Sequence, residues 1–185
     1  SPAEHTVTVR HDGQEFTEGY DKLILSPGAK PFVPAIDGLA EANNVYTLRN
    51  VPDLDEIMAA LDKHPKEAVV IGAGFIGLEM AENLAKRGLQ VTIVEKAPHV
   101  LPPLDQEMAA FVQAELLANG VRVITSQSAI QFEEQGKVIV LENGQKIASD
   151  LTILSVGVEP ENGLAKAAGI ELGLRGGILV DEHYE

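Results

Sequence analysis

The stretch Val69-Val70-Ile71-Gly72-Ala73-Gly74-Phe75-Ile76-Gly77-Leu78-Glu79 predicts the fold of this chain. An apolar run rich in β-branched residues leads into a Gly-x-Gly-x-x-Gly turn, and an amphipathic segment from Phe75 to Arg87 follows. A buried strand, a tight glycine turn and a helix in this order are typical of a dinucleotide-binding unit. The N-terminus of such a helix offers free N–H groups and a partial positive charge to a pyrophosphate.

Each glycine of the turn has a physical task in this interpretation. Gly72 permits the sharp turn out of the strand, Gly74 lets the backbone approach a pyrophosphate, and Gly77 lets the helix lie close to the strand. Glu95 ends the next strand 18 residues after Gly77, where an acid that accepts hydrogen bonds from a ribose diol is expected. Its carboxylate would repel the 2′-phosphate of NADP by roughly 4 kcal/mol at a separation near 4 Å, which favours NAD. Lys96 could attract that phosphate if its side chain turned inward.

The composition narrows the class of protein. The 185 residues carry a net charge of −14 and no cysteine. The acidity disfavours nucleic acid and anionic membranes as partners, and the lack of cysteine excludes disulfides and redox thiols within these residues. No apolar run reaches the length of a membrane helix and no signal peptide is visible, which predicts a cytoplasmic protein. The five histidines show no metal-ligand spacing, so no metal site is predicted.

The rest of the chain alternates strand and helix patterns around the glycine turn. The expected elements are a hairpin over 6–17, a strand over 20–25, a helix opened by a cap at Asp53 and stopped near 65, a strand over 90–95, a helix over 106–119, a strand over 121–124, a meander over 129–147, a strand over 151–155, a short helix over 164–168 and a strand over 178–180. Met108, Phe111, Val112 and Leu116 are expected on one face of the helix over 106–119. These patterns predict an α/β fold, a Rossmann-like doubly wound parallel sheet with an antiparallel β-meander.

Four segments together resemble the pyridine nucleotide–disulfide oxidoreductases, and most closely the branch of coenzyme A-disulfide reductases and NADH oxidases. The segments are YDKLILSPGA over 20–29, YTLRNVPD over 46–53, VIGAGFIGLE over 70–79 and SVGVEP over 155–160. They occur in the family's order and cover nearly the whole chain. This resemblance is therefore more specific than the glycine turn alone.

The resemblance implies an FAD domain interrupted by an NAD(P)H domain, followed by a dimerisation domain. Residues 30–155 would form the NAD(P)H-binding domain, while 1–29 and 156–185 would be flanking segments, short strands left over from the FAD domain. In the intact enzyme, expected to be a homodimer, the nicotinamide would transfer hydride to flavin, with a disulfide such as coenzyme A disulfide, or oxygen or peroxide, as final acceptor. The FAD fingerprint and the redox cysteine of the family are absent here. No catalytic residue is therefore assigned, and the fragment alone is expected to be inactive.

The resemblance also implies a row of cofactor-binding residues along the nucleotide and at the crossover between the two domains. They are Gly72, Ala73, Gly74, Phe75, Ile76, Gly77, Glu79, Glu95, Lys96, Val156, Gly157, Ser26, Pro27 and Gly28. The glycine turn takes the pyrophosphate and Glu95 the adenine ribose. Phe75 has the position of a ring that often gates the nicotinamide pocket, and Glu79 that of an acid near nicotinamide and flavin. Gly157 falls where the backbone passes close to the nucleotide, and Ser26-Pro27-Gly28 replaces the more usual Thr-Gly start of the crossover motif.

Two other functions remain open from the sequence. The same glycine turn followed by an acid also serves FAD, so the chain could be the FAD-binding half of a flavoprotein. Such a turn normally lies near a chain start, whereas about 70 residues precede it here. The domain could also be a non-catalytic NAD-sensing module.

Overall fold

The computed structural model describes residues 1–184, which form two compact units. The larger unit is Pro31–Val158, and the smaller combines Ser1–Lys30 with the segment from Glu159 onward. A five-stranded parallel sheet lies at the centre of the larger unit. Its strands, in spatial order, are β4 (Val45–Tyr46), β11 (Leu151–Leu154), β5 (Glu67–Ile71), β6 (Gln90–Val94) and β7 (Arg122–Ile124).

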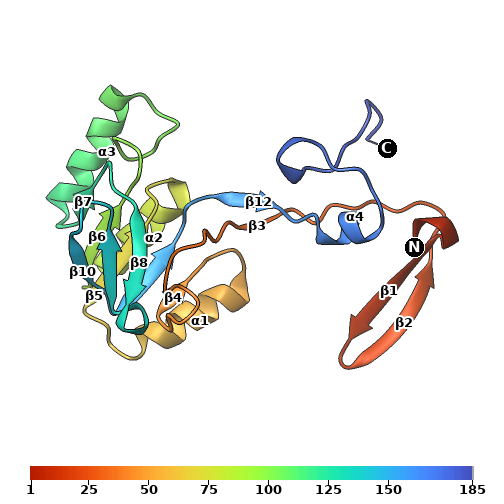
Figure 1. Cartoon of the computed structure of the whole chain (residues 1–185), viewed down its shortest axis with the longest axis horizontal. Helices are drawn as coiled ribbons and strands as arrows, with labels where there is room; N and C mark the ends of the chain where they lie inside the picture. The colour runs from red at the N-terminus through yellow and green to blue at the C-terminus, as the bar shows by residue number, and fades with distance from the viewer. Residues whose placement is uncertain (185) are drawn as a thin grey trace. The chain divides into compact units, whose positions relative to one another are not determined.

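Three helices cover one face of this sheet. They are α1 (Val51–Leu61), α2 (Phe75–Lys86) and α3 (Gln106–Ala118), which follow β4, β5 and β6 along the chain (Figure 1). Val70 of β5 and Ile93 of β6 pack in one buried cluster with Ile57 of α1, Leu84 of α2 and Leu116 of α3. This cluster holds the helices against the strands, since burial of apolar surface is the main stabilising term.

An antiparallel meander covers the other face of the sheet. Its strands are β8 (Ala129–Glu133), β9 (Val138–Leu141) and β10 (Lys146–Ala148), with the short helix η2 (Glu134–Gly136) between the first two. Val69 and Ile71 of β5 pack against Phe132, Ile139 and Leu141 of the meander, because successive strand residues point to opposite faces. The α/β fold with a Rossmann-like parallel sheet and an antiparallel meander is thus confirmed, with the meander as the layer opposite the helices.

The smaller unit consists of short elements. They are η1 (Pro2–Glu4), the hairpin strands β1 (Thr6–His11) and β2 (Gln14–Gly19), α4 (Gly163–Ala167) and η3 (Leu174–Gly176). The strands β3 (Ala29–Pro31) and β12 (Val158–Pro160) pair with each other and contain the residues at which one unit ends and the other begins along the chain. The rings of His5 and Tyr20 stack with centroids 5.5 Å apart at the base of the hairpin. The predicted hairpin and short helix are therefore present.

Two predicted strands are wrong. Residues 20–25 form no strand, and Ile24 is 90% exposed. An apolar run needs a neighbouring strand to satisfy its backbone, and within residues 1–184 no strand pairs with this segment. Over 178–180 only Ile178 forms an isolated bridge, to Leu172.

The details of two helices also differ from the predictions. Asn50, and not Asp53, is the N-cap of α1, and Asp53 is the third helical residue of a capping box in which each side chain accepts the other's backbone N–H. In α3 the predicted cap Asp105 does accept from the N–H of Met108. Of the four residues predicted on one face, Leu116 is buried and Val112 packs against the core, as expected. Met108 and Phe111 are exposed, however, and Ala109 is buried with Leu116.

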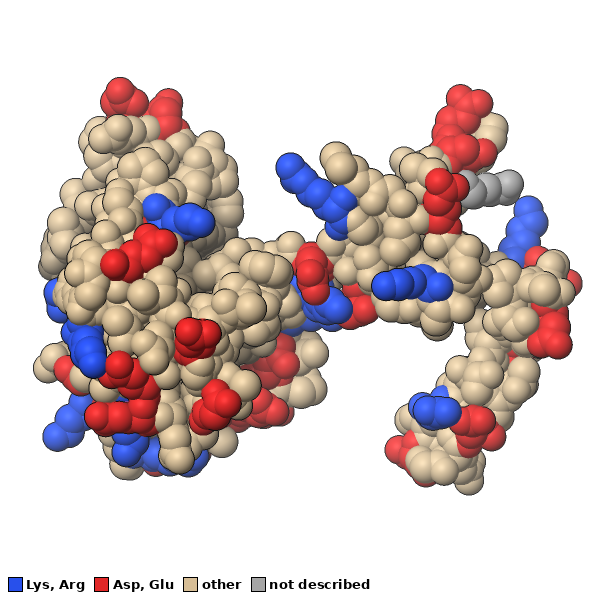
Figure 2. Space-filling view, viewed as in Figure 1, with Lys and Arg blue, Asp and Glu red and all other residues tan. Residues whose placement is uncertain are grey.

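Asp150 joins the turn before β11 to the start of β5. Its Oδ2 accepts hydrogen bonds from the backbone N–H groups of Lys66 and Glu67, at 2.8 and 3.0 Å. These two bonds hold the pKa of the Asp150 carboxyl below its ordinary value, because they stabilise the charged form. On the face of the larger unit seen in Figure 2, basic and acidic side chains are interspersed. Within residues 1–184, no helix is both long and apolar enough to span a membrane.

Candidate dinucleotide site

A cavity of about 820 Å³ lies in the larger unit, where three neighbouring strands of the parallel sheet end. Gly72 follows β5, Glu95 follows β6 and Ser155 follows β11, and all three residues line the cavity. The carboxyl ends of parallel strands meet at one edge of a sheet, which is where open α/β sheets bind their ligands.

Gly72 and Gly77 hold the glycine turn against the neighbouring strand. Gly72 has a φ of 102°, and a Cβ at this position would lie 2.4 Å from the carbonyl oxygen of Ser155. A Cβ at Gly77 would lie only 2.0 Å from the carbonyl oxygen of Gly72. The Ser155 hydroxyl donates to the carbonyl oxygens of Ile71 and Gly72, both at 3.1 Å. Sterics therefore require glycine at both positions for the fold itself.

Gly74 differs from the other two glycines. It is the N-cap of α2 in an extended conformation, with a φ of −76°, and no side chain among the described residues caps the helix. A Cβ built on Gly74 meets no protein atom within 4 Å. The space beside Gly74 is therefore open, and the first N–H groups of a twelve-residue helix face an uncapped end. This combination fits a bound anion such as a pyrophosphate.

Glu95 is 8% exposed and binds the glycine turn directly. Its Oε2 accepts from the N–H of Ala73 at 2.6 Å, and its Oε1 accepts from the N–H of Ala97 at 2.7 Å. The carbonyl of Ala73 accepts in turn from the N–H of Leu101 at 2.8 Å. The carboxylate is thus held in place by two backbone donors.

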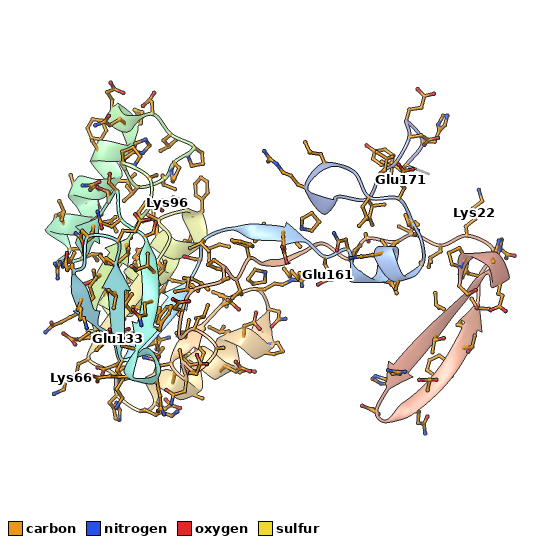
Figure 3. The ribbon with its side chains drawn as sticks, in the orientation of Figure 1. Lys22, Lys66, Lys96, Glu133, Glu161 and Glu171 are labelled. Carbon is orange, nitrogen blue, oxygen red and sulfur yellow. The ribbon has the colours of Figure 1, made fainter. Side chains whose placement is uncertain are left out.

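Polar groups gather on the Glu95 side of the cavity. Lys96, labelled in Figure 3, is exposed and lines the cavity directly after Glu95. Gln127 and Ser128 line it from the start of the meander, and the Ser128 hydroxyl is buried without a hydrogen-bond partner within residues 1–184. Pro102 closes this wall in the loop after β6.

Apolar groups gather on the β11 side. Phe75 and Ile76, at the start of α2, are 66% and 45% exposed, although both are large and hydrophobic. Val156 and Gly157 continue the chain beyond β11 and also line the cavity. Gly157 has a φ of 119°, and a Cβ there would meet no protein atom within 4 Å.

The structure brings most of the predicted site residues together. Those that line the cavity are Gly72, Gly74, Phe75, Ile76, Glu95, Lys96, Val156 and Gly157. Ala73 and Gly77 belong to the same turn but are buried behind the lining. Glu79 lines a second groove of about 530 Å³ between α1 and α2, which shares Leu48, Phe75 and Ile76 with the cavity.

The crossover residues Ser26, Pro27 and Gly28 belong to the smaller unit. There the carbonyl of Gly28 accepts from the N–H of Glu161 at 3.0 Å, so the crossover segment is tied to the residues that follow β12. Their predicted role toward a cofactor stays a prediction.

Sequence reasoning missed one wall of the cavity. Pro31, Phe32, Pro34, Ala35 and Ile36 line it from the segment that precedes β4. The two prolines in this segment indicated only an extended linker. The sequence signal that could have indicated a cavity wall here is the aromatic residue Phe32 between Pro31 and Pro34. The lining residue Ser155 belonged to a recognised motif, but its hydrogen bonds to the glycine turn could not be read from the spacing.

Comparison with known proteins identifies the family. A family model described as pyridine nucleotide-disulphide oxidoreductase matches residues 1–185. The chain is 40% identical over 168 residues to an NADH oxidase of Methanocaldococcus jannaschii, covering 89% of this chain and 37% of the relative. It is 32% identical over 185 residues to a coenzyme A disulfide reductase of Staphylococcus haemolyticus, covering 98% and 41%. The crystal structure of reduced Bacillus anthracis CoADR-RHD superposes with a TM-score of 0.95 at 48% identity, covering 99% of this chain and 33% of that one.

The chain thus spans between 33% and 41% of the length of these relatives, which fits a fragment of an oxidoreductase. The comparisons confirm the resemblance that the four sequence motifs carry. Members of this family use NAD(P)H and FAD, which agrees with the cofactors expected from the sequence. The chain belongs to the pyridine nucleotide-disulphide oxidoreductase family.

Proposed function

We propose that the unit Pro31–Val158 is the NAD(P)H-binding domain of an FAD-dependent oxidoreductase, and that it prefers NADH. The observation that carries this proposal is the uncapped N-terminus of α2 beside the open Gly74 turn, with the fixed carboxylate of Glu95 next to it. The helix end supports binding of a pyrophosphate, and the acid supports binding of a ribose.

The proposed direction of the nucleotide follows from the strand order β11-β5-β6. Glu95 after β6 receives the adenine ribose, the glycine turn after β5 receives the pyrophosphate, and Val156 and Gly157 after β11 receive the nicotinamide. The polar wall then faces the adenosine, and the apolar wall of Phe75 and Ile76 faces the nicotinamide. A dinucleotide bound this way crosses the carboxyl ends of three strands, as in other open α/β sheets.

Glu95 supports the preference for NADH. Each of its carboxylate oxygens accepts one backbone hydrogen bond and keeps a further lone pair for a ribose hydroxyl. The charge of the same group repels a 2′-phosphate, and it cannot move away without losing its bonds to Ala73 and Ala97. Lys96 is exposed and therefore more strongly screened by solvent, so it offsets this repulsion only in part.

The role of this domain in the intact protein is orientation. When FAD is bound by the intact enzyme, it supplies the hydride acceptor. The residues of this chain hold the nicotinamide in position and surround it with apolar side chains that exclude water. We propose a disulfide, such as coenzyme A disulfide, or oxygen or peroxide as the final acceptor, and a cytoplasmic homodimer as the intact enzyme. The residues that would select among these acceptors are not assigned to this chain.

Calorimetric titration of the 185-residue chain with NADH, NADPH and FAD tests the proposal. We expect one saturable site for NADH, weaker binding of NADPH and the weakest binding of FAD. Tighter binding of FAD than of NADH would instead identify the chain as a flavin-binding half. Absence of binding by either pyridine nucleotide would also reject the proposal.

A further inference from the structure

Phe32 is an exposed aromatic residue on the wall that the linker contributes to the cavity. The phenyl side chain is 43% exposed and lines the cavity, as does that of Phe75. The chain has five phenylalanines. Phe132 is buried in the core, while the exposed Phe16 and Phe111 are not among the lining residues. Phe32 and Phe75 are thus the phenyl rings that this cavity presents to a ligand.

The backbone of Phe32 is fixed at the β11 end of the cavity. Its N–H donates to the carbonyl oxygen of Gly157 at 2.9 Å. Pro31 precedes it and Pro34 follows two residues later, and both restrict the backbone because the proline ring locks φ. The backbone from which the ring projects is therefore held in place before any ligand binds, which lowers the entropic cost of a contact.

The topology places Phe32 at one end of the proposed nucleotide. Gly157 follows β11, which is separated from β6 and Glu95 by β5. A nucleotide whose adenosine lies at Glu95 therefore reaches Phe32 only with its other end. A phenyl ring offers a flat apolar face with a negative quadrupole, which suits a planar heterocycle.

We propose that Phe32 is a positioning residue for the nicotinamide ring, contacting it from the linker while Phe75 contacts it from the start of α2. This inference rests on the proposed function, because it needs the dinucleotide to lie across β6, β5 and β11. It assigns a role to the linker before β4, which makes this segment part of the binding site as well as a connection between the two units.

Binding of two ligands to the chain of residues 1–185 tests this proposal. NADH carries the nicotinamide ring, whereas ADP-ribose carries the same adenosine and pyrophosphate without it. We expect Phe32→Leu to weaken NADH binding about three- to tenfold, since an aromatic pair contributes on the order of 0.5–1.5 kcal/mol, and to leave the affinity for ADP-ribose unchanged. Phe32→Tyr keeps the ring and should bind NADH as the parent chain does. Phe111→Leu removes an exposed ring from α3 and serves as the matched control.

The outcomes separate this proposal from the proposed function. Loss of NADH affinity in Phe32→Leu alone, with ADP-ribose unaffected, supports the contact. Equal affinities of Phe32→Leu and the parent chain for NADH, or equal losses for both ligands, overturn it while the dinucleotide site stands. A parent chain that binds neither ligand rejects the proposed function and this inference with it.

Discussion

The carboxylate of Glu95 accepts a hydrogen bond from the backbone N–H of Ala73 at 2.6 Å, which joins the end of β6 to the middle of the glycine turn. The same carboxylate accepts from the N–H of Ala97 at 2.7 Å. One side chain thus connects the turn after β5 with the loop after β6. Its charge and its hydrogen bonds are therefore expected to affect both cofactor choice and local stability.

Glu95→Gln keeps the shape of the side chain and removes its charge. We expect the ratio of NADPH to NADH affinity to rise by about tenfold or more, because a charge repulsion of roughly 1.4 kcal/mol or greater is lost. The free energy of unfolding should fall by about 1–3 kcal/mol. The reason is that the amide NH₂ group would face the N–H of either Ala73 or Ala97 and could not accept its hydrogen bond. Calorimetric titration and urea unfolding measure the two effects.

Glu82→Gln is the matched control, since Glu82 pairs with Lys86 on the exposed side of α2. An exposed pair contributes little, so neither the affinity ratio nor the stability should change noticeably. If Glu95→Gln behaved like this control, the role given to Glu95 would be wrong.

Gly74→Ala and Gly77→Ala separate binding from folding. A methyl group at Gly74 meets open space, so this variant should melt within a few degrees of the parent and bind NADH at least about tenfold more weakly. A methyl group at Gly77 would lie 2.0 Å from the carbonyl oxygen of Gly72, so this variant should lose about 2–4 kcal/mol of stability. Thermal unfolding followed by circular dichroism, with NADH titration, provides both readouts. A Gly74→Ala chain that binds NADH normally would remove the pyrophosphate from this turn.

Two serines that line the cavity should respond differently to substitution by alanine. Ser155→Ala removes the donor to the carbonyls of Ile71 and Gly72, and we expect a loss of about 1 kcal/mol in the free energy of unfolding. Ser128→Ala removes a buried hydroxyl without a partner in the described residues, so the stability should stay equal or rise slightly. Urea unfolding of the two variants side by side measures this difference, and a larger loss for Ser128→Ala would contradict it.

Asp150 gives the stability a dependence on acid pH. Its folded pKa lies below the ordinary value, so its contribution to stability is complete above the unfolded pKa of about 4 and is lost as the pH falls through the folded pKa. Asp150→Asn should therefore lower the free energy of unfolding at pH 7, and the difference between this variant and the parent should shrink as the pH falls below the ordinary pKa of an aspartate. Unfolding in urea across this pH range tests the sign. If the difference in the free energy of unfolding between the two chains grew toward acid pH, the carboxyl would not be stabilised in its charged form.

Much of the parallel sheet could be predicted from the sequence because buried strands, glycine turns and caps have strong local signals. The strand-turn-helix unit around Gly72 and the cap of α3 at Asp105 are examples. The segment 20–25 looks the same locally, but a strand depends on a neighbour that no local pattern reveals. The predicted face of α3 is correct for Val112 and Leu116, which lie against the core, but wrong for Met108 and Phe111, which are exposed, while the small Ala109 is buried.

The candidate site was predictable where chemistry follows fixed spacing. Glu95 could be located by its distance from the glycines, but its bonds to Ala73 and Ala97 depend on how the loop folds back. The wall around Phe32 lies far from the glycine turn in the sequence, and only the pairing of β3 with β12 and the bond to Gly157 bring it to the cavity.

Backbone amide shifts in NMR spectra, recorded with AMP, ADP-ribose and NADH in turn, test the central claim most directly. We predict that AMP shifts the amides of Lys96 and Gln127, that ADP-ribose adds those of Gly74 and Phe75, and that NADH alone adds that of Gly157. This order would place adenosine, pyrophosphate and nicotinamide along β6, β5 and β11. Shifts of Gly157 by AMP without Lys96, or shifts by NADH confined to residues outside Pro31–Val158, would contradict the account.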